Sequence, residues 1–244
     1  MPTNTLQDWF ATPLGQYLLE KEQAYLDDVT SDVFGFHALQ IGMPNVDLLR
    51  ESRIAHRMRV AAADRPDLYA KSHELPFATQ SVDLVVLPHV LEFAAGPHEI
   101  LREVDRVMMP EGRLVIVGFN PWSLWGLRSS VGFGREEYPW NGRFVSLLRV
   151  KDWLALLGFD VNAGRLVGYA PPFKSETVRR RFGFMEPAGD RWWAVGGAVY
   201  MLQAIKRVRG MRLLTPAWME QKDAREKALA AAKRQSASPL KVVK

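Results

Sequence analysis

The fold is decided by the stretch VDLVVLPHVLEFAAGPHEILREVDRVMMPEGRLVIVG, which occupies residues 82–118. It begins with a β-branched, apolar run of strand length, typical of a strand that is buried on both faces. Residues 97–109 then place their apolar side chains on one face of a helix, and Pro97 suits its first turn. The Pro-Glu-Gly sequence at 110–112 ends this helix, and residues 113–118 form a second buried strand. Strand, helix and strand at this spacing predict a βαβ unit and a parallel sheet.

The chain before this unit predicts a helical segment and two more strands. In residues 1–30, apolar side chains recur at steps of about three and four residues, which indicates helix. Pro13 and Gly15 are expected to interrupt it. Residues 36–42 form a short, mainly apolar run that ends at a glycine, and we interpret it as the first core strand. Residues 57–63 are predicted as the second strand.

The chain after this unit predicts a long insertion, a helix and two strands. Residues 119–143 are rich in Trp, Gly and Pro and are predicted to form a loop. Residues 150–157 are typical of a helix that ends at Gly158, and a strand is predicted over 159–169. Residues 198–208 fit a strand or a short helix. We favour the strand, because two glycines precede it and its far end is basic.

The composition is that of a globular protein with one large α/β domain, to which we assign residues 1–219. The chain has 244 residues, of which 48% are hydrophobic and 24% charged, enough for a full hydrophobic core. It contains no cysteine, which excludes disulfides, a thiolate nucleophile and a Cys-ligated zinc site. The five histidines are scattered without metal-ligand spacing, so no metal is predicted.

No targeting or membrane segment is predicted. Residues 1–25 lack the continuous apolar run of a signal peptide. The longest uncharged stretch near the C-terminus, residues 192–205, has 14 residues, fewer than the roughly 20 of a membrane-spanning helix. Together with the absence of cysteine, this predicts a cytoplasmic protein without a transmembrane segment.

The positive charge of the chain is concentrated at its C-terminal end. The net charge is +5, and residues 220–244 contain seven basic and three acidic side chains. These residues have no apolar stripe, so we predict that 220–244 form a basic, disordered tail. A nucleic-acid groove needs excess positive charge on the folded body. The nearly neutral remainder therefore argues against nucleic acid as a partner.

A series of short motifs runs in order through residues 72–117. They are Glu74-Leu-Pro-Phe77, Ser81-Val-Asp83-Leu-Val-Val86, Val90-Leu-Glu92-Phe93, Leu101-Arg-Glu103-Val and Arg106-Val-Met-Met-Pro110-Glu-Gly112, followed by the strand at 113–117. In this order they resemble the class I S-adenosylmethionine-dependent methyltransferase family, specifically its type 11 branch. The resemblance implies a three-layer, Rossmann-like α/β fold. Its sheet would be mostly parallel and seven-stranded, with an antiparallel last strand at 198–208.

The resemblance also implies S-adenosylmethionine as the cofactor. In an open parallel sheet, ligands bind beyond the carboxyl ends of the strands, where the strand order reverses. The first strand and its loop would hold the amino-acid part, the end of the second strand the ribose, and the next loop the adenine. The loop after the fourth strand would face the sulfonium. The residues at these places are Gln40, Gly42, Asp64, His73, Glu74, Pro88 and His89.

The loop after the first strand departs from the family pattern. The family sequence is an acid followed by x-Gly-x-Gly-x-Gly, whose glycines allow the backbone to approach the ligand closely. Here the residues are Gln40-Ile-Gly42-Met-Pro44-Asn-Val46, in which only Gly42 matches. Pro44 has no N–H to donate, and Val46 resists a positive φ. We therefore expect cofactor binding that is altered, weakened or lost.

Each candidate residue also has a purely structural interpretation. His89 is the candidate general base beside the methyl donor, or a histidine at a helix start that is bonded to backbone. Gly42 admits the cofactor or only ends a strand, and Asp64 binds ribose or is an ordinary turn residue. His73 and Glu74 contact adenine or are solvated turn residues.

The acceptor site is predicted in the chain that follows the strand at 113–118. The candidate substrate-binding residues are Asn120, Trp122 and Tyr138, although Asn-Pro is also an ordinary turn signal. The aromatic side chains of the insertion form a lid over a hydrophobic acceptor, stack on a planar substrate or are part of the core; they are Trp122, Trp125, Phe133, Tyr138 and Trp140. A basic set either binds an anionic acceptor or lipid headgroups, or is a solvated loop; it consists of Lys174, Arg179, Arg180 and Arg181.

The function predicted on these grounds is S-adenosylmethionine-dependent methyl transfer to a small-molecule acceptor. Transfer from a sulfonium requires mainly alignment and exclusion of water, which agrees with the lack of a recognisable catalytic triad. The alternative is a catalytically inactive protein of this fold that serves as a binding or regulatory module. A nucleic-acid-modifying enzyme is a third class, and the charge distribution disfavours it.

Overall fold

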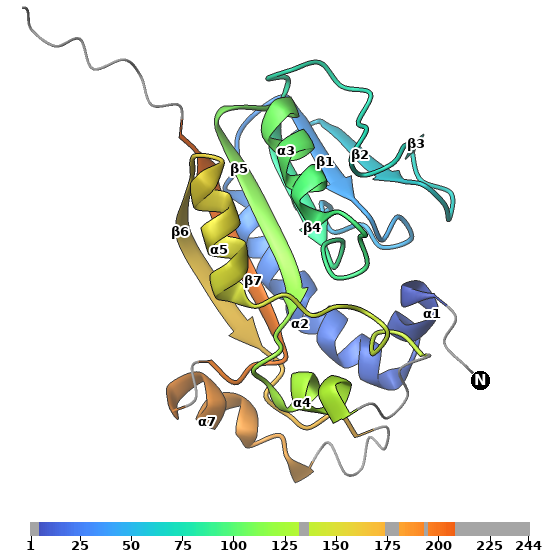
Figure 1. Cartoon of the computed structure of the whole chain (residues 1–244), viewed down its shortest axis with the longest axis vertical. Helices are drawn as coiled ribbons and strands as arrows, with labels where there is room; N and C mark the ends of the chain where they lie inside the picture. The colour runs from blue at the N-terminus through green and yellow to red at the C-terminus, as the bar shows by residue number, and fades with distance from the viewer. Residues whose placement is uncertain (1–4, 132–136, 174–180, 193–194, 208–244) are drawn as a thin grey trace, which may run out of the picture. The chain divides into compact units, whose positions relative to one another are not determined.

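The central feature of the computed structural model is one sheet of seven strands, in the order β3-β2-β1-β4-β5-β7-β6 (Figure 1). The structure describes residues 5–131, 137–173, 181–192 and 195–207. All of these fall within the unit Met1–Val208, and the second unit of the chain, Arg209–Lys244, lies outside the described residues. The predicted tail, 220–244, belongs to that second unit.

Five strands of the sheet are parallel and the last strand of the chain is antiparallel to both of its neighbours. β1, β2, β3, β4 and β5 pair in parallel, while β7 is antiparallel to β5 and β6. The strand bounds are β1 His37–Ile41, β2 His56–Ala61, β3 Leu68–Tyr69, β4 Val82–Pro88, β5 Met108–Phe119, β6 Phe159–Val167 and β7 Val199–Lys206. The predicted seven-stranded sheet with an antiparallel last strand is confirmed, and the strand interpretation of 198–208 is correct.

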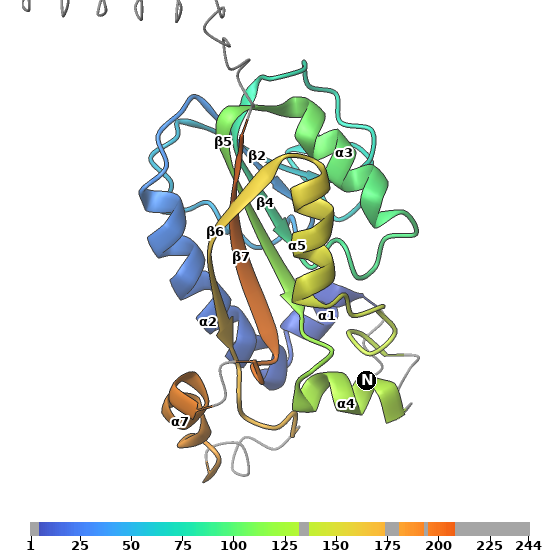
Figure 2. The ribbon, with the colours of Figure 1, turned by 60° about the vertical axis from the view of Figure 1, so that its left-hand side comes forward.

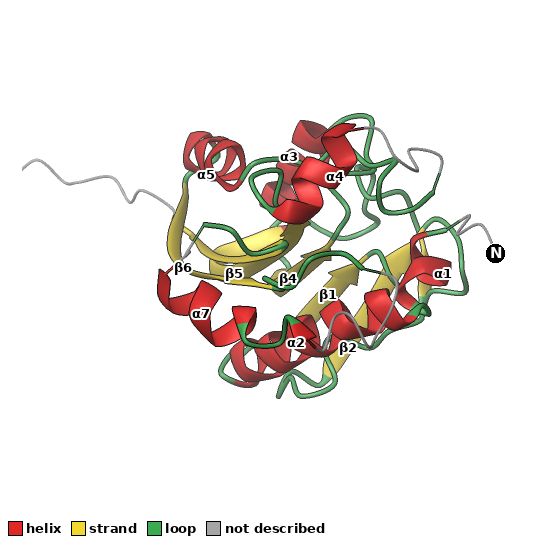
Figure 3. Cartoon of the chain, turned by 90° about the horizontal axis from the view of Figure 1, so that it is seen from below, coloured by secondary structure: helices red, strands yellow, loops and turns green. Residues whose placement is uncertain are grey.

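Helices cover both faces of the sheet, which makes the three predicted layers. The helix bounds are α1 Leu6–Phe10, α2 Pro13–Ser31, α3 Pro97–Val107, α4 Leu124–Val131, α5 Leu147–Leu156 and α7 Met185–Trp192. Figure 3 shows α2 on one face of the sheet and α3 and α5 on the other. β4 illustrates why: Leu84 and Val86 pack in the cluster that contains the α2 side chains, and Val85 and Leu87 pack in the cluster of α3 and α5. Successive side chains of a strand point to opposite faces.

The N-terminal segment divides into two helices at Ala11 and Thr12. The Thr12 side chain caps the second helix, and Pro13 is its first residue, a position where proline is favoured. Gly15 was expected to interrupt the helix, and this expectation is wrong, since it lies inside α2. A Cβ atom at Gly15 would stand 2.3 Å from the carbonyl oxygen of Trp9. The glycine is therefore needed for the close packing of α1 on α2.

The insertion at 119–143, predicted as a loop, contains the helix α4. The Ser123 hydroxyl accepts a hydrogen bond from the Gly126 N–H at 3.0 Å, which is the geometry of a helix N-cap. The glycine and tryptophan content of the insertion concealed this signal. α7 and the two-residue strand β3 were also not predicted. Figure 2 shows α4 and α7 beyond the end of the sheet toward which β5 points.

The connection between β1 and β2 contains no helix, because residues 42–55 form only turns and irregular backbone. Parallel strands are usually joined through a helix. Here the earlier helix α2 covers the corresponding face, and the connection is free to fold as a compact loop at the carboxyl end of β1. That end of the sheet is where the candidate site residues were predicted.

Candidate functional site

The loop after β1 begins with the glycine that the sequence singled out. Gly42 has a φ of 92°, in the left-handed region that favours glycine. Its N–H donates to the carbonyl of Val60 at 2.8 Å. A Cβ atom at this position would stand 2.8 Å from the side chain of Val90, in the loop after β4. Gly42 therefore allows the loops after β1 and β4 to approach each other.

Gln40 organises this loop from inside the protein. Its side chain is fully buried, and its amide nitrogen lies within hydrogen-bond distance of the carbonyls of Gly42, Met43 and Val46, at 3.1, 2.9 and 2.8 Å. Its amide oxygen accepts from the Leu48 N–H at 3.0 Å. A carboxylate has no hydrogen to donate, so an acid at this position could not hold the three carbonyls. Gln40 thus has a structural role in this loop that an acid could not perform.

Two further contacts fix the same loop. Arg59 donates to the carbonyl of Pro44 at 2.8 Å and forms a paired interaction with both carboxylate oxygens of Asp67, at 2.9 and 2.8 Å. The hydrogen bond from Arg59 lowers the pKa of Asp67 below its ordinary value. On the other side, Asn45 donates to the side chain of Gln7 in α1. The loop is therefore tied both to β2 and to the N-terminal helix.

His89 lies at the centre of a buried cluster of charged side chains just after β4. It is 1% exposed and has a φ of 52°, an uncommon and strained value for a residue other than glycine. Its Nε2 lies 3.1 Å from the carboxylate of Glu22 in α2, and its Nδ1 lies 3.3 Å from that of Glu92. Glu92 also accepts a hydrogen bond from the Phe119 N–H at 2.7 Å. The cluster joins α2, the loop after β4 and the end of β5.

The two carboxylates determine the charge of His89. Burial by itself lowers the pKa of the imidazole, but the charges and hydrogen bonds of Glu22 and Glu92 outweigh it and raise the pKa to about 10. The second oxygen of each carboxylate and the hydroxyl of Tyr200 are buried without a hydrogen-bond partner among the described residues. Burial, followed by the charge of Glu92, raises the pKa of Tyr200. Uncompensated polar atoms of this kind in a buried position require an explanation.

Aromatic side chains enclose this cluster. The ring of Phe119 lies 4.3 Å and that of Phe10 5.5 Å from the His89 ring, centre to centre. Trp9 packs edge-on against Phe119 and Trp125 at 5.8 and 6.1 Å. Helix α1, which supplies Phe10 and Trp9, is therefore the cover over the carboxyl end of β4.

The predicted cofactor residues divide into a buried and an exposed set. Gln40, Gly42, Pro88 and His89 come together at the ends of β1 and β4. The remaining three lie on exposed loops; they are Asp64, His73 and Glu74. Asp64 has a φ of 69° and follows β2, and Glu74 forms an exposed ion pair with Lys71 at 3.2 Å.

The predicted substrate residues have different environments. Asn120 is buried, and its amide donates to the carbonyls of Val195 and Gly197 at 2.8 and 2.9 Å; it braces the loop before β7. Trp122 is 78% exposed. Tyr138 is half-buried, with its ring 5.0 Å from that of Phe93.

The other residues of the aromatic and basic sets are buried in the core, exposed, or outside the described residues. Trp125 and Trp140 are buried in the core, as the structural interpretation of the insertion proposed. Phe133, Lys174, Arg179 and Arg180 lie outside the described residues, and Arg181 is exposed.

Glu22 is the site residue that sequence reasoning missed. It occupies the same helical face as Leu14, Leu18 and Leu26, all of them buried. A charged residue on an apolar helix stripe is a signal, because such a side chain is rarely buried without a partner. Its partner His89 is 67 residues away in the chain, so the pairing itself was not visible in the sequence.

Two negative findings concern only the described residues. Among them, no group of three or more His, Asp or Glu side chains has an arrangement suited to a metal ion. In the same part of the chain, no helix combines the length and apolar character needed to cross a membrane.

Comparison with known proteins gives matches along most of the chain. Residues 45–116 match the family described as "Methyltransferase domain". The chain is 39% identical to the uncharacterized protein YafS of Escherichia coli (strain K12) over 155 residues, which cover 63% of this chain and 65% of that protein. It is 30% identical to the demethylmenaquinone methyltransferase of Chlamydia pneumoniae over 81 residues, 32% of this chain and 35% of that one. The chain therefore spans less than two thirds of the length of these relatives.

A solved structure has the same fold. The SAM-dependent methyltransferase of Archaeoglobus fulgidus superimposes with a TM-score of 0.56 at 19% sequence identity, covering 78% of this chain and 94% of that one. At this level of identity the likeness concerns the arrangement of the strands and helices.

Proposed function

The chain is a member of the class I S-adenosylmethionine-dependent methyltransferase family, and from this premise we propose that it transfers a methyl group from S-adenosylmethionine to a small-molecule acceptor. The cofactor would supply a methyl group that is already activated for in-line displacement. The tasks left to the protein are binding, alignment and exclusion of water. The argument below concerns the residues that would perform them.

One observation carries the proposal: Glu22 and Glu92 each keep a buried carboxylate oxygen that has no hydrogen-bond partner among the described residues. The two carboxylates face one imidazolium, so the cluster has one negative charge in excess. In a buried position water screens this charge poorly, and a cation there is strongly favoured. The sulfonium of the proposed cofactor is such a cation, and the end of β4 is where the family places it. The residues present therefore fit the group.

Other residues would hold the remaining parts of the cofactor. The backbone at Gly42 would hold the amino-acid part; it lies against the loop after β4, where a Cβ atom would stand 2.8 Å from the Val90 side chain and 3.5 Å from the Pro88 carbonyl. Asp64 follows β2 and is exposed, so its carboxylate is available to ribose hydroxyls. Because Phe10 covers His89, α1 has to move aside for entry and then closes the site against water.

The raised pKa of His89 changes the role that we assign to it. With a pKa of about 10, the imidazole is protonated at neutral pH and has no lone pair with which to accept a proton. We therefore assign His89 the role of orienting Glu22 and Glu92. For an acceptor that has to lose a proton, the proposed base is a carboxylate of this pair.

The alternative, a non-catalytic binding or regulatory module, is favoured by a different observation. The amide of Gln40 is fully used inside the loop after β1, so this side chain has nothing left to offer a ligand. A loop closed in this way is also what a protein without a cofactor would retain. The two functions differ in whether the cofactor binds.

Calorimetric titration of the purified chain with S-adenosylmethionine and S-adenosylhomocysteine separates them. We expect micromolar binding to the wild type and its loss in Gly42→Val, because the added side chain meets Val90 and strains the left-handed backbone.

The matched control is Gly158→Val. Gly158 also has a positive φ, 84°, but it follows α5, away from β4, and among the described residues a Cβ atom there meets one atom, the Arg207 carbonyl oxygen at 3.5 Å. Binding retained by this variant and lost by Gly42→Val supports a cofactor site at Gly42. No heat at millimolar ligand with the folded wild type would overturn the proposal in favour of the binding module.

A further inference from the structure

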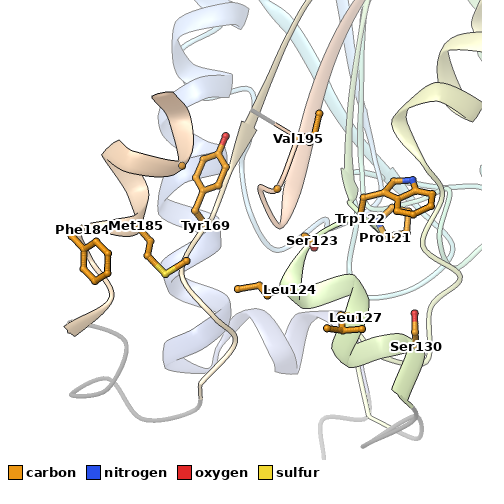
Figure 4. Close-up of a pocket in the computed structure, with 12 residues that line it drawn as sticks. Pro121, Trp122, Ser123, Leu124, Leu127, Ser130, Tyr169, Phe184, Met185 and Val195 are labelled. Carbon is orange, nitrogen blue, oxygen red and sulfur yellow. The ribbon is translucent and has the colours of Figure 1, made fainter. Parts of the chain in front are cut away.

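A large apolar pocket opens beyond the sheet, between α4 and α7 (Figure 4). Its volume is about 840 Å³, within the range of small-molecule sites. Figure 4 shows Trp122, Leu124 and Leu127 on one side of it and Tyr169 and Met185 on the other. Three separate connections meet here: the chain after β5, the chain after β6 and the chain before β7.

The lining of the pocket is apolar and uncharged. The described residues that line it include no acidic or basic side chain. The Ser123 hydroxyl donates to the Asn120 carbonyl at 2.7 Å, and the Ser130 hydroxyl donates to the Gly126 carbonyl at 2.9 Å. Both hydroxyls are thus used within α4 and its cap. Apolar surface is removed from water when a hydrocarbon enters such a pocket, which favours binding.

The exposure of the lining side chains is an argument that a ligand binds in this pocket. Trp122, Leu127, Phe184 and Val195 are all exposed, although large apolar residues gathered in one place are usually covered. Their arrangement is hollow rather than flat, and a volume of this size suits a small molecule better than a protein surface.

The pocket is next to the charged cluster at the end of β4. Pro121 lines the pocket and lies two residues after Phe119, whose N–H donates to Glu92. Trp125, in α4, faces Trp9, which in turn faces Phe119 beside His89. The pocket and the charged cluster therefore lie at the same end of the sheet, and buried aromatic rings stand between them.

From these observations, and resting on the methyl transfer proposed above, we propose that the acceptor carries an uncharged hydrocarbon chain and that this chain occupies the pocket between α4 and α7. Neither a charged sugar or nucleotide nor a small polar acceptor would use the apolar surface. The chain can be isoprenoid or straight, since both offer the same chemistry to the pocket, and the experiment distinguishes them.

The test measures binding of farnesol and of dodecanol to the full chain by fluorescence, without any cofactor, with triethylene glycol as the polar control. We expect at least one alcohol to bind, with a blue shift of tryptophan emission because the exposed Trp122 becomes covered. Trp122→Phe should lose most of this shift while it still binds. Binding of farnesol alone identifies an isoprenoid chain, dodecanol alone a straight chain, and both a general hydrocarbon site.

Two lysine variants locate the binding. Leu127→Lys places a charge in the pocket, and because Leu127 is exposed the variant should fold; we expect its affinity for the alcohol to fall at least tenfold. Leu156→Lys is the matched control, since Leu156 is 86% exposed on α5 and does not line the pocket; its affinity should equal that of the wild type.

Three outcomes would overturn the inference. They are no binding of either alcohol up to its solubility, equal binding by wild type and Leu127→Lys, and self-association of the chain that Leu127→Lys abolishes without any alcohol binding. Because the measurement uses no cofactor, its result is independent of the calorimetric test. Cofactor binding without alcohol binding would overturn only the acceptor class.

Discussion

At the scale of single residues, the molecule concentrates strain and charge at His89. A left-handed backbone and a fully buried imidazolium are both unfavourable in isolation, and they persist because Glu22 and Glu92 bracket the ring. In the folded state the pKa of His89 is about 10, against an ordinary value of 6.5. A raised pKa means that the protonated form stabilises the fold. This stabilisation is complete below about pH 6.5 and is lost as the pH rises through about 10.

The first prediction follows from the raised pKa of His89, which makes the protonated form stabilise the fold. His89→Asn keeps a side chain that tolerates a left-handed backbone but leaves two buried carboxylates without their cation, which should cost roughly 3–5 kcal/mol of stability near neutral pH. The measurement is the free energy of unfolding in urea at several pH values between 6.5 and 10. We expect the difference between wild type and variant to shrink as the pH rises. A constant difference across this range would contradict the assigned charge of His89.

A second prediction concerns Gln40. Gln40→Glu places a carboxylate at this position and removes the donor that holds three loop carbonyls. Leaving buried carbonyls unpaired should cost about 1–3 kcal/mol. Gln203→Glu is the control, because within the described part of the chain the amide of Gln203 donates to the Tyr25 hydroxyl alone, and this hydroxyl can donate to a carboxylate instead. Equal unfolding midpoints for the two variants would show that the loop does not depend on the Gln40 amide.

At the scale of secondary-structure elements, α1 is the cover of the proposed site, because Phe10 packs on His89 and Trp9 on Phe119. α1 is a short helix that is held by Gly15 of α2 and by the contact of Gln7 with Asn45. Gly15→Ala should stabilise α2 by about 1 kcal/mol, because alanine has the higher helix propensity. The added methyl group, however, would meet Trp9 and Phe10. We expect the steric cost, about 1–3 kcal/mol, to prevail and α1 to separate from α2.

Hydrogen exchange measures this separation. The amides of α1 and of the loop after β4 should exchange faster in Gly15→Ala, while those of α5 remain unchanged. The control is Glu20→Ala, at an exposed position of α2. It should leave the exchange of α1 and of the loop after β4 as in the wild type. Unchanged exchange in α1 would show that this helix adapts to the extra methyl group and does not act as a separate cover.

The elements also show how far the fold could be predicted from the sequence. β4, α3 and β5 were predicted because each has a long apolar run or stripe that only one structure can bury. The boundary between the last two was wrong, since α3 ends at Val107 and β5 already begins at Met108 and includes the Pro-Glu-Gly sequence. β3 has only two residues and exists through its pairing with β2, so no local pattern marks it. α4 was missed because its cap and its apolar side chains stand among the tryptophans and glycines of an apparent loop.

The candidate site was predictable only in the part that topology determines. Gly42 and His89 follow strands whose order is fixed by the fold, and they lie where parallel strands end. The role of Gln40 was not predictable, since its partners are backbone carbonyls rather than side chains with a sequence signature. Whether Asp64, His73 and Glu74 contact a cofactor stays a prediction, which the binding measurements test.

At the scale of the whole described unit, the two ends of the sheet differ in the buried charged groups that they contain. At the end opposite the charged cluster, Lys206 of β7 lies 3.0 Å from the Asp105 carboxylate and donates to the Met108 carbonyl at 3.1 Å, so the Lys206 ammonium is paired. At the carboxyl end, Glu22, Glu92 and Tyr200 keep polar atoms that no described residue pairs. Buried polar groups that remain unpaired lower stability. The buried hydroxyl of Thr30, in α2, also lacks a hydrogen-bond partner among the described residues. What distinguishes the carboxyl end is that two carboxylates gather there around one imidazolium.

The last prediction separates stability from binding by comparing the two ends. Lys206→Met should lower the free energy of unfolding by about 1–3 kcal/mol, because Met108 loses its donor, and should leave the affinity for S-adenosylmethionine unchanged at a temperature where the variant is folded. Glu22→Gln removes the excess negative charge of the cluster and should weaken the same affinity about tenfold, which corresponds to about 1.4 kcal/mol. The measurement is calorimetric titration of both variants at low temperature, with circular dichroism as the check of folding. Equal losses of affinity in the two variants would mean that binding follows global stability; a loss confined to Glu22→Gln would mean that the buried charge itself attracts the cofactor.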